Sequence, residues 1–525
     1  MRDAIGEVLR SRAREAPDRL CCAIDTNSFS FAEIDVRSDQ IAAGAAAIGV
    51  GKGDRVATLA PNRVELLELF YGLAKVGAAQ VPLNAFLKGE FLRHQLSQSR
   101  ASLLITDAAG RDAVAPLRAE LPDLGRVVML DEAEGGEVPY GELSVAGTTP
   151  PNVSLTATDT MSIVYTSGTT GLPKGCVASH GYYCRSGEVI GRALEVDDDD
   201  VLFAGLPLFH SGGRLVTVAL PLLFGIPTHI QSTFSASGYF PQAKQAGATL
   251  MVAVGAMGAA VLASEPSPAD RDHSVTRVMC APLTLPAQQM FRDRFGVEPW
   301  VDVFGQSECM PIMATALSAS QRDPAGCGVP ADDLEVALLD DEGRAVEGDG
   351  VGEICVRPLT PDVMFDGYFE RPEATLDAFR GLWYHTGDYG RRLSSGAYTF
   401  VDRKKDALRR RGENVSSIEL ELGINRHPEV VESAVHALPS ELGEDDIKAC
   451  LVVVEGTVLD PAEVFAYFRE NLPYFAIPRY VEIIDVLPRN AVGRVMKHKL
   501  REAGNGPGVW DFDALGFSVT RSQRR

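Results

Sequence analysis

The chain of 525 residues lacks the features that mark secreted or repetitive proteins. Its nine cysteines are an odd number and include no C-x-x-C pair, so we expect reduced thiols in a cytoplasm instead of a disulfide framework. The first ten residues carry charges throughout and have no apolar segment, so we expect no secretory signal. Neither an internal repeat nor a low-complexity linker is apparent.

Positive charge is scarce relative to negative charge. The chain has 50 basic and 71 acidic residues, which gives a formal net charge of -21. Long-range attraction to nucleic acid or to an anionic membrane is therefore not expected, so we expect neither of these as a partner. Any anionic ligand must be held by a local group of donors.

Long apolar runs are also scarce. The uncharged stretch Ala246 to Ala263 raises the question of a membrane span, but it is rich in Gly and Ala and poor in Leu and Ile. A short strand, Thr249 to Val254, followed by a helix of small residues explains it better. The four carboxylates Asp197 to Asp200 have no His nearby, so we interpret them as a solvated turn before a strand and not as a metal site.

The most informative segment is Tyr165 to Gly175, which reads YTSGTTGLPKG. Its glycines allow consecutive backbone N–H groups to converge on an anion, and its hydroxyls and one lysine supply further donors for phosphate oxygens. It is not a Walker loop, because Pro173 precedes Lys174 and Gly175 follows it. The apolar run Met161 to Tyr165 predicts a buried strand leading into the loop. The pattern predicts a phosphate-binding loop.

Helical and strand patterns alternate over the first four hundred residues, which predicts an α/β body with largely parallel sheets and flanking helices. After Asp402-Arg-Lys-Lys-Asp406 the pattern restarts as a small α+β module. Within it Asp460 is a candidate helix N-cap, with Pro461 at the first helical position. We therefore expect a large N-terminal domain, residues 1–404, and a small mobile C-terminal lid, residues 405–525.

The phosphate loop resembles the signature of the acyl-adenylate-forming superfamily, which includes acyl- and aryl-CoA ligases, luciferases and the adenylation domains of peptide synthetases. Further segments match in the expected order, so the resemblance covers nearly the whole chain and is greatest to the acyl-CoA ligase branch. They are Leu206-Pro-Leu-Phe-His210, Phe304-Gly-Gln-Ser-Glu308, Gly352-Glu-Ile-Cys-Val-Arg357, Tyr384-His-Thr-Gly-Asp388, Asp402-Arg-Lys-Lys-Asp406 and Arg411-Gly-Glu-Asn414.

This resemblance implies an AMP-forming acid–thiol ligase with two half-reactions at one site. A carboxylate first attacks ATP, with Mg²⁺, to give an acyl-adenylate; the thiol of CoA then attacks the acyl carbon and releases AMP. The residues that it implies for the nucleotide are Thr166, Ser167, Gly168, Thr169, Thr170, Lys174, Phe304, Gly305, Ser307, Asp388 and Arg403. Glu308 resembles the glutamate associated with Mg²⁺, and Asp388 resembles the aspartate that accepts both ribose hydroxyls. Phe304 stands where the family mostly has tyrosine, which keeps a stacking ring without a phenolic hydrogen bond.

The second half-reaction has its own implied residues. Lys405 falls at the hinge position, and Gly412, Glu413 and Asn414 match the loop that admits the pantetheine arm of CoA. His210 resembles the histidine that closes the acyl pocket and gates the thiol tunnel; Ser211-Gly-Gly213 after it suggests an open loop, and the alternative is a buried structural histidine.

The acyl pocket is the least determined part of the site. Amino-acid-activating relatives usually place an aspartate just after the phenylalanine that is Phe209 here, whereas this chain has His210 and Ser211, so an amino acid is disfavoured. Candidate wall residues are Val254, Gly255, Met257, Cys309 and Met310. Their small and flexible side chains suit a roomy apolar cavity, although plain core packing explains the same residues equally well.

One position departs from the family pattern. Family members typically have a Gly-Lys near the C-terminus whose lysine bridges the carboxylate and the phosphate during adenylation, and this chain has Arg494 there. A guanidinium is a wide planar fork, so it does not replace a compact ammonium between two anions. Lys497, three residues on, either substitutes for it or is a solvated lysine.

Three functions therefore remain open. In the first, thioesterification is intact, adenylation is impaired and a separate adenylating enzyme supplies the acyl-adenylate. The second is a complete ATP-dependent ligase that uses Arg494 or Lys497. The third is a protein that binds a nucleotide or acyl-CoA without turnover.

Overall fold

The structure is a computed structural model of the chain. It describes residues 3–87, 89–144, 147, 149–166, 173–320, 322–403, 408–410, 413–415, 417–439, 445–472, 476–489 and 495–517. Their packing divides the chain into two units. The first consists of Met1–Val336, Val356–Tyr384 and Leu393–Thr399, and the second consists of Ala337–Cys355, His385–Arg392 and Phe400–Arg525.

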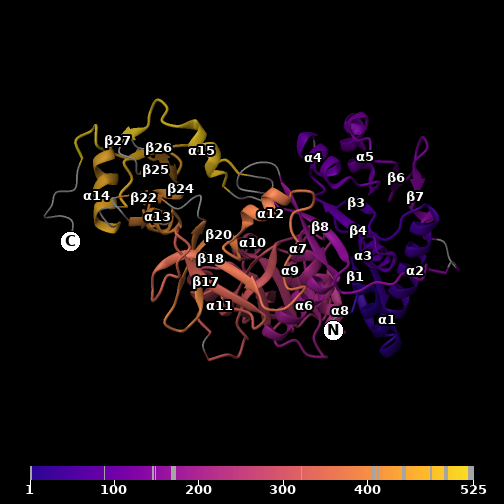
Figure 1. The fold of residues 1–525 in the computed structure, drawn as a ribbon. Helices are drawn as coiled ribbons and strands as arrows, with labels where there is room; N and C mark the ends of the chain where they lie inside the picture. The colour runs from indigo at the N-terminus through magenta and orange to yellow at the C-terminus, as the bar shows by residue number, and fades with distance from the viewer. Residues whose placement is uncertain are drawn as a thin grey trace. The chain divides into compact units, whose positions relative to one another are not determined.

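Two seven-stranded sheets form the body of the first unit (Figure 1). The strands of one, in spatial order, are β14 (Glu298–Trp300), β13 (Arg277–Ala281), β12 (Leu250–Val254), β10 (Leu202–Ala204), β11 (Thr228–Ile230), β1 (Leu20–Ile24) and β2 (Asn27–Ser30). Those of the other are β7 (Val138–Pro139), β6 (Arg126–Met129), β5 (Leu103–Thr106), β3 (Arg55–Leu59), β4 (Ala79–Leu83), β8 (Thr160–Thr166) and β9 (Lys174–Ser179). Every pair is parallel except β1 with β2 and β8 with β9. The expected α/β body with largely parallel sheets is confirmed.

Helices connect and cover these strands, as parallel pairing requires. In the first unit they are α1 (Ile5–Glu15), α2 (Phe31–Ala47), α3 (Val64–Val76), α4 (Gly89–Ser99), α5 (Ala108–Val114), α6 (His180–Ala193), α7 (Ser211–Arg214), α8 (Leu220–Phe224), α9 (Tyr239–Gln245), α10 (Gly255–Ala263), α11 (Leu285–Phe295) and α12 (Pro372–Ala378). From Leu66 onward every residue of α3 is buried, including Glu68 and Lys75. These two are ion-paired, Glu68 with Arg37 and Lys75 with Asp35, so α3 is held in the core as a fully enclosed helix.

The stretch that raised the question of a membrane span is part of this body. β12 runs into α10, as the pattern of small residues predicts. Within the described ranges, no helix has both the length and the apolar character to cross a membrane.

The acidic run before β10 differs from expectation. The Asp197 N–H donates to Asp200 Oδ2, so the segment does form a turn. Asp200 is nevertheless buried, and it pairs with Arg277 at 2.5 Å and accepts a hydrogen bond from Thr249. The interpretation of the whole run as solvated was wrong for Asp200, because its partners lie far away in the sequence.

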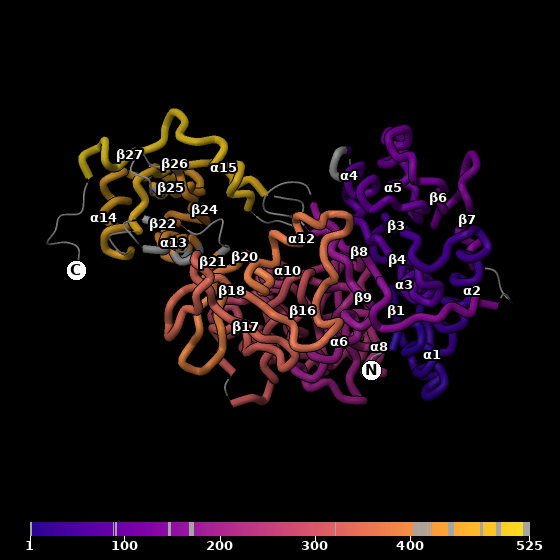
Figure 2. The backbone as a smooth tube through the Cα atoms, in the orientation of Figure 1, coloured from indigo at the N-terminus to yellow at the C-terminus, as the bar shows by residue number. Residues whose placement is uncertain are grey.

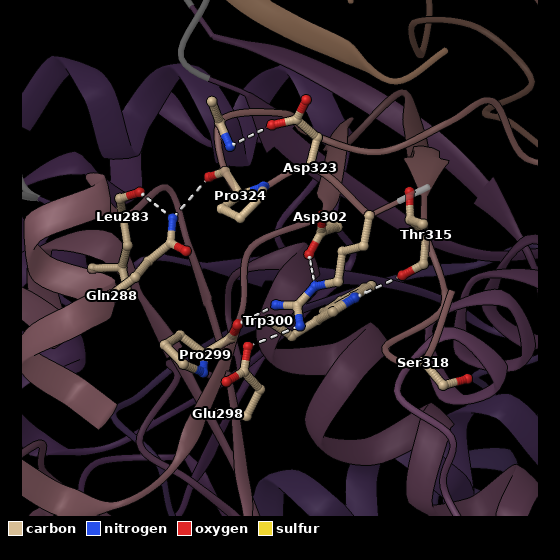
Figure 3. A network of polar contacts seen from close by, with 12 residues as sticks. Leu283, Gln288, Glu298, Pro299, Trp300, Asp302, Thr315, Ser318, Asp323 and Pro324 are labelled. Carbon is tan, nitrogen blue, oxygen red and sulfur yellow. Dashed lines mark hydrogen bonds and ion pairs between the residues drawn. The ribbon is translucent and has the colours of Figure 1, made fainter. Parts of the chain in front are cut away.

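A polar network fixes the base of a hairpin that matters for the site (Figure 3). The hairpin consists of β15 (Val303–Gln306) and β16 (Cys309–Ala314). Arg322 pairs with Asp302, just before β15, at 2.6 Å and with Glu298 at 2.8 Å. The indole N–H of buried Trp300 donates to the Thr315 carbonyl at 2.8 Å, just after β16. Both ends of the hairpin are therefore anchored: Asp302 is held by Arg322, which also pairs with Glu298 of β14, and Thr315 is held by Trp300 of β14.

A five-stranded sheet carries residues of both units. Its strands are β17 (Leu334–Leu339), β18 (Val351–Pro358), β20 (Trp383–Arg392), β19 (Phe379–Arg380) and β21 (Tyr398–Arg403), and β18 and β20 are neighbours. The second unit also contains a small hairpin, β22 (Leu408–Arg410) with β23 (Glu413–Val415).

The rest of the second unit is the expected small α+β module. Its four-stranded sheet consists of β24 (Val430–Pro439), β25 (Asp445–Val453), β26 (Tyr480–Ile483) and β27 (Trp510–Asp511), and its helices are α13 (Ser417–Ile424), α14 (Pro461–Asn471) and α15 (Lys497–Ala503). The Asp460 side chain accepts the N–H groups of Ala462 and Glu463, which confirms it as the N-cap of α14. The sheet ends with β27, which pairs antiparallel with β26. The boundary at residues 404 and 405 stays a prediction.

Candidate active site

The phosphate loop lies between two paired strands of the first unit. β8 and β9 are antiparallel and side by side in Figure 2, and their register places Thr166 opposite Lys174. The predicted strand before the loop is confirmed, and Lys174 begins the strand that follows. Ser167, Gly168, Thr169 and Thr170 lie outside the described residues. The hairpin brings the first hydroxyl and the lysine of the loop together where the loop joins the two strands.

Lys174 and Glu308 lie at the same tyrosine. The Nζ of Lys174 is 4.8 Å from the centre of the Tyr368 ring, and the Tyr368 hydroxyl donates to Glu308 Oε1 at 2.9 Å. Burial, followed by the nearby Glu308 charge, raises the pKa of Tyr368, so its hydroxyl stays protonated and keeps donating. The structure thus brings the predicted phosphate lysine and the predicted Mg²⁺ carboxylate to one place.

Glu308 lies in the turn between β15 and β16, and hydroxyl groups hold this turn on several sides. Besides Tyr368, Tyr384 donates to Gln306 Oε1 at 2.8 Å and Tyr182 donates to the Ser307 carbonyl at 3.1 Å. Glu308 as a whole residue is only 8% exposed. None of these three tyrosines was predicted as a site residue; the aromatic residues of Phe365-Asp-Gly-Tyr368 were the available signal for one of them.

The donor set at Glu308 suits Mg²⁺. A buried carboxylate oxygen is a hard ligand, and the neighbouring lysine would share the phosphate groups that complete the coordination of this ion in nucleotide sites. Ser307 adds a hydroxyl, which lies 3.0 Å from the Ser211 hydroxyl. The residues present suit a magnesium ion that is bound together with nucleotide phosphates. They do not suit a metal ion held by protein groups alone.

Ser211 connects this turn to His210. His210 is exposed and its ring centre is 4.8 Å from that of Phe209. Nearby protein atoms lower the pKa of the His210 imidazole by desolvation, so it is neutral at pH 7. The alternative of a buried histidine is wrong, and so is the open loop: His210 precedes α7, and its carbonyl accepts the Arg214 N–H at 3.1 Å.

Phe304 and Gly305 occupy β15, with Phe304 opposite Met313. A Cβ placed on Gly305 would lie 2.6 Å from the Met310 sulfur and 2.8 Å from the Cys309 carbonyl oxygen. Met310 therefore folds directly over the Gly305 backbone, and no larger residue fits there without displacing the hairpin.

The predicted acyl-pocket residues differ in accessibility. Val254, at the end of β12, is 45% exposed, whereas Met257 on α10 is 9% exposed. Gly255 is packed against the Pro282 carbonyl, 2.3 Å from where its Cβ would be. Cys309 is fully buried, with its sulfur 3.6 Å from the Val363 carbonyl oxygen. Val254 thus offers an accessible apolar surface, and Cys309 belongs to the packed interior.

Asp388 belongs to the second unit and is 4% exposed on β20. The preceding Gly387 has a φ of 71°, so β20 contains a left-handed residue directly before Asp388. The Gly387 N–H donates to Glu353 Oε1 at 3.1 Å, and the Asp388 N–H donates to Thr386 at 3.1 Å. These bonds fix the backbone that carries the predicted ribose carboxylate.

Several predicted residues have no described side chain. Arg403 ends β21, and Glu413 and Asn414 lie in β23 opposite Arg410 and Arg409. Lys405, Gly412 and Arg494 lie outside the described residues.

Lys497 is the first residue of α15. Its side chain is 13% exposed and its Nζ lies 2.8 Å from Glu421 Oε1. It also donates to Ser417, whose own hydroxyl donates to Asp402 at 2.6 Å. The interpretation of Lys497 as a solvated lysine was wrong, because α13 supplies it with two partners.

Comparison with known proteins agrees with this arrangement. The family model "AMP-binding enzyme" matches residues 9–369, and "AMP-binding enzyme C-terminal domain" matches residues 419–494. The chain is 31% identical to a crotonobetaine/carnitine–CoA ligase of Salmonella arizonae over 91% of this chain and 94% of that protein.

Solved structures of CoA ligases share the fold. O-succinylbenzoate coenzyme A synthetase from Bacillus subtilis, in complex with AMP, superposes with a TM-score of 0.82 at 25% identity, over 96% of this chain and 99% of that one. Fatty acyl CoA synthetase from Mycobacterium tuberculosis gives 0.74 at 27% identity, over 95% and 98% of the two chains. The chain therefore belongs to the AMP-binding enzyme family, among the adenylate-forming acyl- and aryl-CoA ligases.

Proposed function

We propose that the protein forms a CoA thioester from a carboxylic acid by way of an acyl-adenylate. The observation that carries this proposal is the placement of Lys174 and Glu308 at Tyr368, since a cation and a carboxylate that contact one tyrosine suit phosphates with a magnesium ion. The 31% identity to a CoA ligase over most of the chain supports CoA as the thiol.

In the adenylation step, Thr166 to Thr170 and Lys174 hold the ATP phosphates. Glu308 would hold Mg²⁺, which neutralises phosphate charge as pyrophosphate leaves. Tyr368 keeps the Glu308 carboxylate directed by its hydrogen bond. The acid oxygen bonds to the α-phosphorus, and the bond from that phosphorus to pyrophosphate breaks.

In the thioester step, Asp388 and Arg403 hold the ribose, and the loop Gly412 to Asn414 admits the pantetheine arm. The CoA sulfur bonds to the acyl carbon, the bond from that carbon to the AMP oxygen breaks, and the thiol proton passes to solvent. His210 is neutral at pH 7, so it can close the acyl pocket without adding a charge beside the reacting carbonyl.

We infer further that adenylation is the slower of the two half-reactions, because Arg494 replaces the family lysine. The engagement of Lys497 with Glu421 and Ser417 supports this inference, since a lysine held by two partners must leave them to serve elsewhere. A separate adenylating enzyme then supplies the acyl-adenylate. A complete ligase that uses Arg494 or Lys497 is the second candidate.

The acid is one without a free α-ammonium, given His210 and Ser211 in place of an aspartate. The exposed Val254 favours an acid with an apolar body. Curated relatives are named for crotonobetaine and carnitine, and solved neighbours for fatty acyl and o-succinylbenzoyl groups, so the ligase class is better supported than any single acid. The charge pattern and the nine free thiols favour a cytoplasmic protein.

The test is to measure both half-reactions across a panel of acids. ATP–pyrophosphate exchange reports adenylation, and synthetic acyl-adenylates with CoA, without ATP, report thioester formation. We expect thioester formation to be much faster than exchange. Equal rates would establish the complete ligase, and the absence of both would leave a binding protein.

A further inference from the structure

Three metal-binding side chains meet on two neighbouring strands of the second unit. Glu353 and Cys355 are two residues apart on β18, so their side chains lie on the same face of the sheet, and His385 lies on β20 beside them. Glu353 and Cys355 are 2% and 0% exposed, whereas the His385 side chain is 11% exposed. None of the three is assigned to the nucleotide, the acid or CoA in the function proposed above, although Glu353 holds the Gly387 backbone before Asp388.

The ligand atoms already have nearly the spacing that one ion requires. His385 Nδ1 is 2.9 Å from Glu353 Oε2 and 3.3 Å from Cys355 Sγ, and the three ligand atoms all lie within 4.8 Å of one another. Around a tetrahedral zinc ion, ligand atoms are separated by about 3.3–3.6 Å, given bond lengths of about 2.0–2.3 Å. The two separations from His385 come close to these values, and the third, which is at most 4.8 Å, would close by about an ångström or less as an ion enters.

We propose that Glu353, Cys355 and His385 form a transition-metal site with Zn²⁺ as its preferred ion. A thiolate and an imidazole favour Zn²⁺ over Mg²⁺ or Ca²⁺, and the carboxylate supplies the third ligand. Three protein ligands leave the fourth position for water. The partial exposure of His385 gives the ion a path from solvent.

A further contact supports the site. Glu353 Oε1 accepts the Gly387 N–H at 3.1 Å, whereas Oε2 is the oxygen that faces His385. One carboxylate oxygen therefore fixes the side chain and leaves the other directed at the ion, as second-shell bonds do in known metal sites.

Metal binding changes the protons at the site. Zn²⁺ replaces the thiol proton of Cys355, which passes to solvent. His385 gives its Nδ1 lone pair to the ion and carries its remaining proton on Nε2. Since the thiol proton is released when the ion binds, affinity should fall as the pH is lowered.

The experiment is a titration of the full-length, metal-free protein with Co²⁺, followed by near-ultraviolet absorption. One equivalent should produce a thiolate-to-cobalt charge-transfer band, and Zn²⁺ should remove it. Cys355→Ser should abolish the band and weaken Co²⁺ binding by at least about 100-fold, since losing even a second-shell partner costs about 10–100-fold.

The matched control is Cys327→Ser. Cys327 is only half-buried, with its sulfur 3.3 Å from the Tyr398 carbonyl oxygen, so it is the thiol where adventitious binding is expected. This variant should keep the band and the affinity.

No thiolate band in the unaltered protein would overturn the proposal, whatever happens to the folding of the variants. A band that survives Cys355→Ser would overturn it as well. His385→Asn provides a second variant that keeps the thiol: it should weaken Co²⁺ binding to a similar extent, and unchanged binding would exclude His385 as a ligand. The test does not depend on ligase activity, so its failure leaves the proposed function intact.

Discussion

The ammonium of Lys497 lies 2.8 Å from the Glu421 carboxylate, between the first turn of α15 and α13. The two residues are far apart in the sequence, and both side chains are less than one-fifth exposed. Burial raises the pKa of Glu421, opposed by the charge of Lys497, so the carboxylate depends on that lysine to remain ionised. Lys497 therefore has a structural partner that any catalytic role would have to disrupt.

Lys497→Ala should destabilise the second unit. The substitution leaves the largely buried Glu421 carboxylate without its cation, so the free energy of unfolding should fall by about 3 kcal/mol. This is the low end of the range for buried ion pairs, because both side chains are partly exposed to water. Urea unfolding measures the effect. The double variant with Glu421→Gln should recover much of the loss, since it removes the charge as well. An unchanged free energy of unfolding for Lys497→Ala would mean that the ion pair contributes nothing to stability.

Arg494→Lys should raise ATP–pyrophosphate exchange and leave the thioester step nearly unchanged. A well-placed cation in a charged transition state is worth about 3–4 kcal/mol, or several hundred-fold in rate. Comparing both half-reactions in the parent and the variant measures this. If the parent exchanges rapidly and Lys497→Ala, still folded, abolishes that exchange, Lys497 is the working lysine and the prediction is wrong.

Glu308→Gln should slow adenylation by about 10²–10³-fold, because the amide binds Mg²⁺ poorly and cannot offset its charge. The control is Tyr368→Phe, which removes the hydroxyl bonded to Glu308 and keeps the ring beside Lys174. This variant should slow adenylation by only about tenfold, because it removes one hydrogen bond to a charged group. Exchange rates over a range of Mg²⁺ concentrations separate the two variants, and equal losses would contradict this assignment.

Asp388→Ala should weaken AMP binding by about tenfold or more, since a charge-assisted contact to the ribose hydroxyls is worth about 1.5–3 kcal/mol. Calorimetry of AMP or an acyl-adenylate tests it. Unchanged affinity would place the ribose elsewhere.

Stability should fall on mild acidification because of His180. Burial lowers the pKa of this histidine from 6.5 to about 4, and its Nδ1 accepts the Ile5 N–H at 3.3 Å. The unfolded chain binds a proton below about pH 6.5 and the folded one does not, so this contribution is complete above pH 6.5 and is lost as the pH falls towards 4. The full effect is about 3 kcal/mol.

Thermal unfolding between pH 7 and pH 4 would show this slope. His180→Gln keeps an acceptor without the titration, so it should flatten the slope by about that amount. An unchanged slope would assign the acid sensitivity to other groups.

Local sequence determined much of the architecture. The alternation of apolar runs and helical patterns predicted the parallel sheets, and the strand before the phosphate loop was confirmed as β8. Asp460 was recognised as an N-cap because its partners, Ala462 and Glu463, lie within three residues. These signals depend on residues that lie close together in the sequence, so they can be recognised without knowledge of the tertiary fold.

Tertiary structure decided what the sequence left open. The hydroxyls of Tyr182, Tyr368 and Tyr384 converge on the turn at Glu308 from separate segments. Asp200 was interpreted as part of a solvated turn, and solvation was one of two alternatives for Lys497, yet each forms a buried pair, Asp200 with Arg277 and Lys497 with Glu421. A charged side chain is stable in the interior only when a partner is brought to it, and that partner comes from a distant segment that the folded chain alone places.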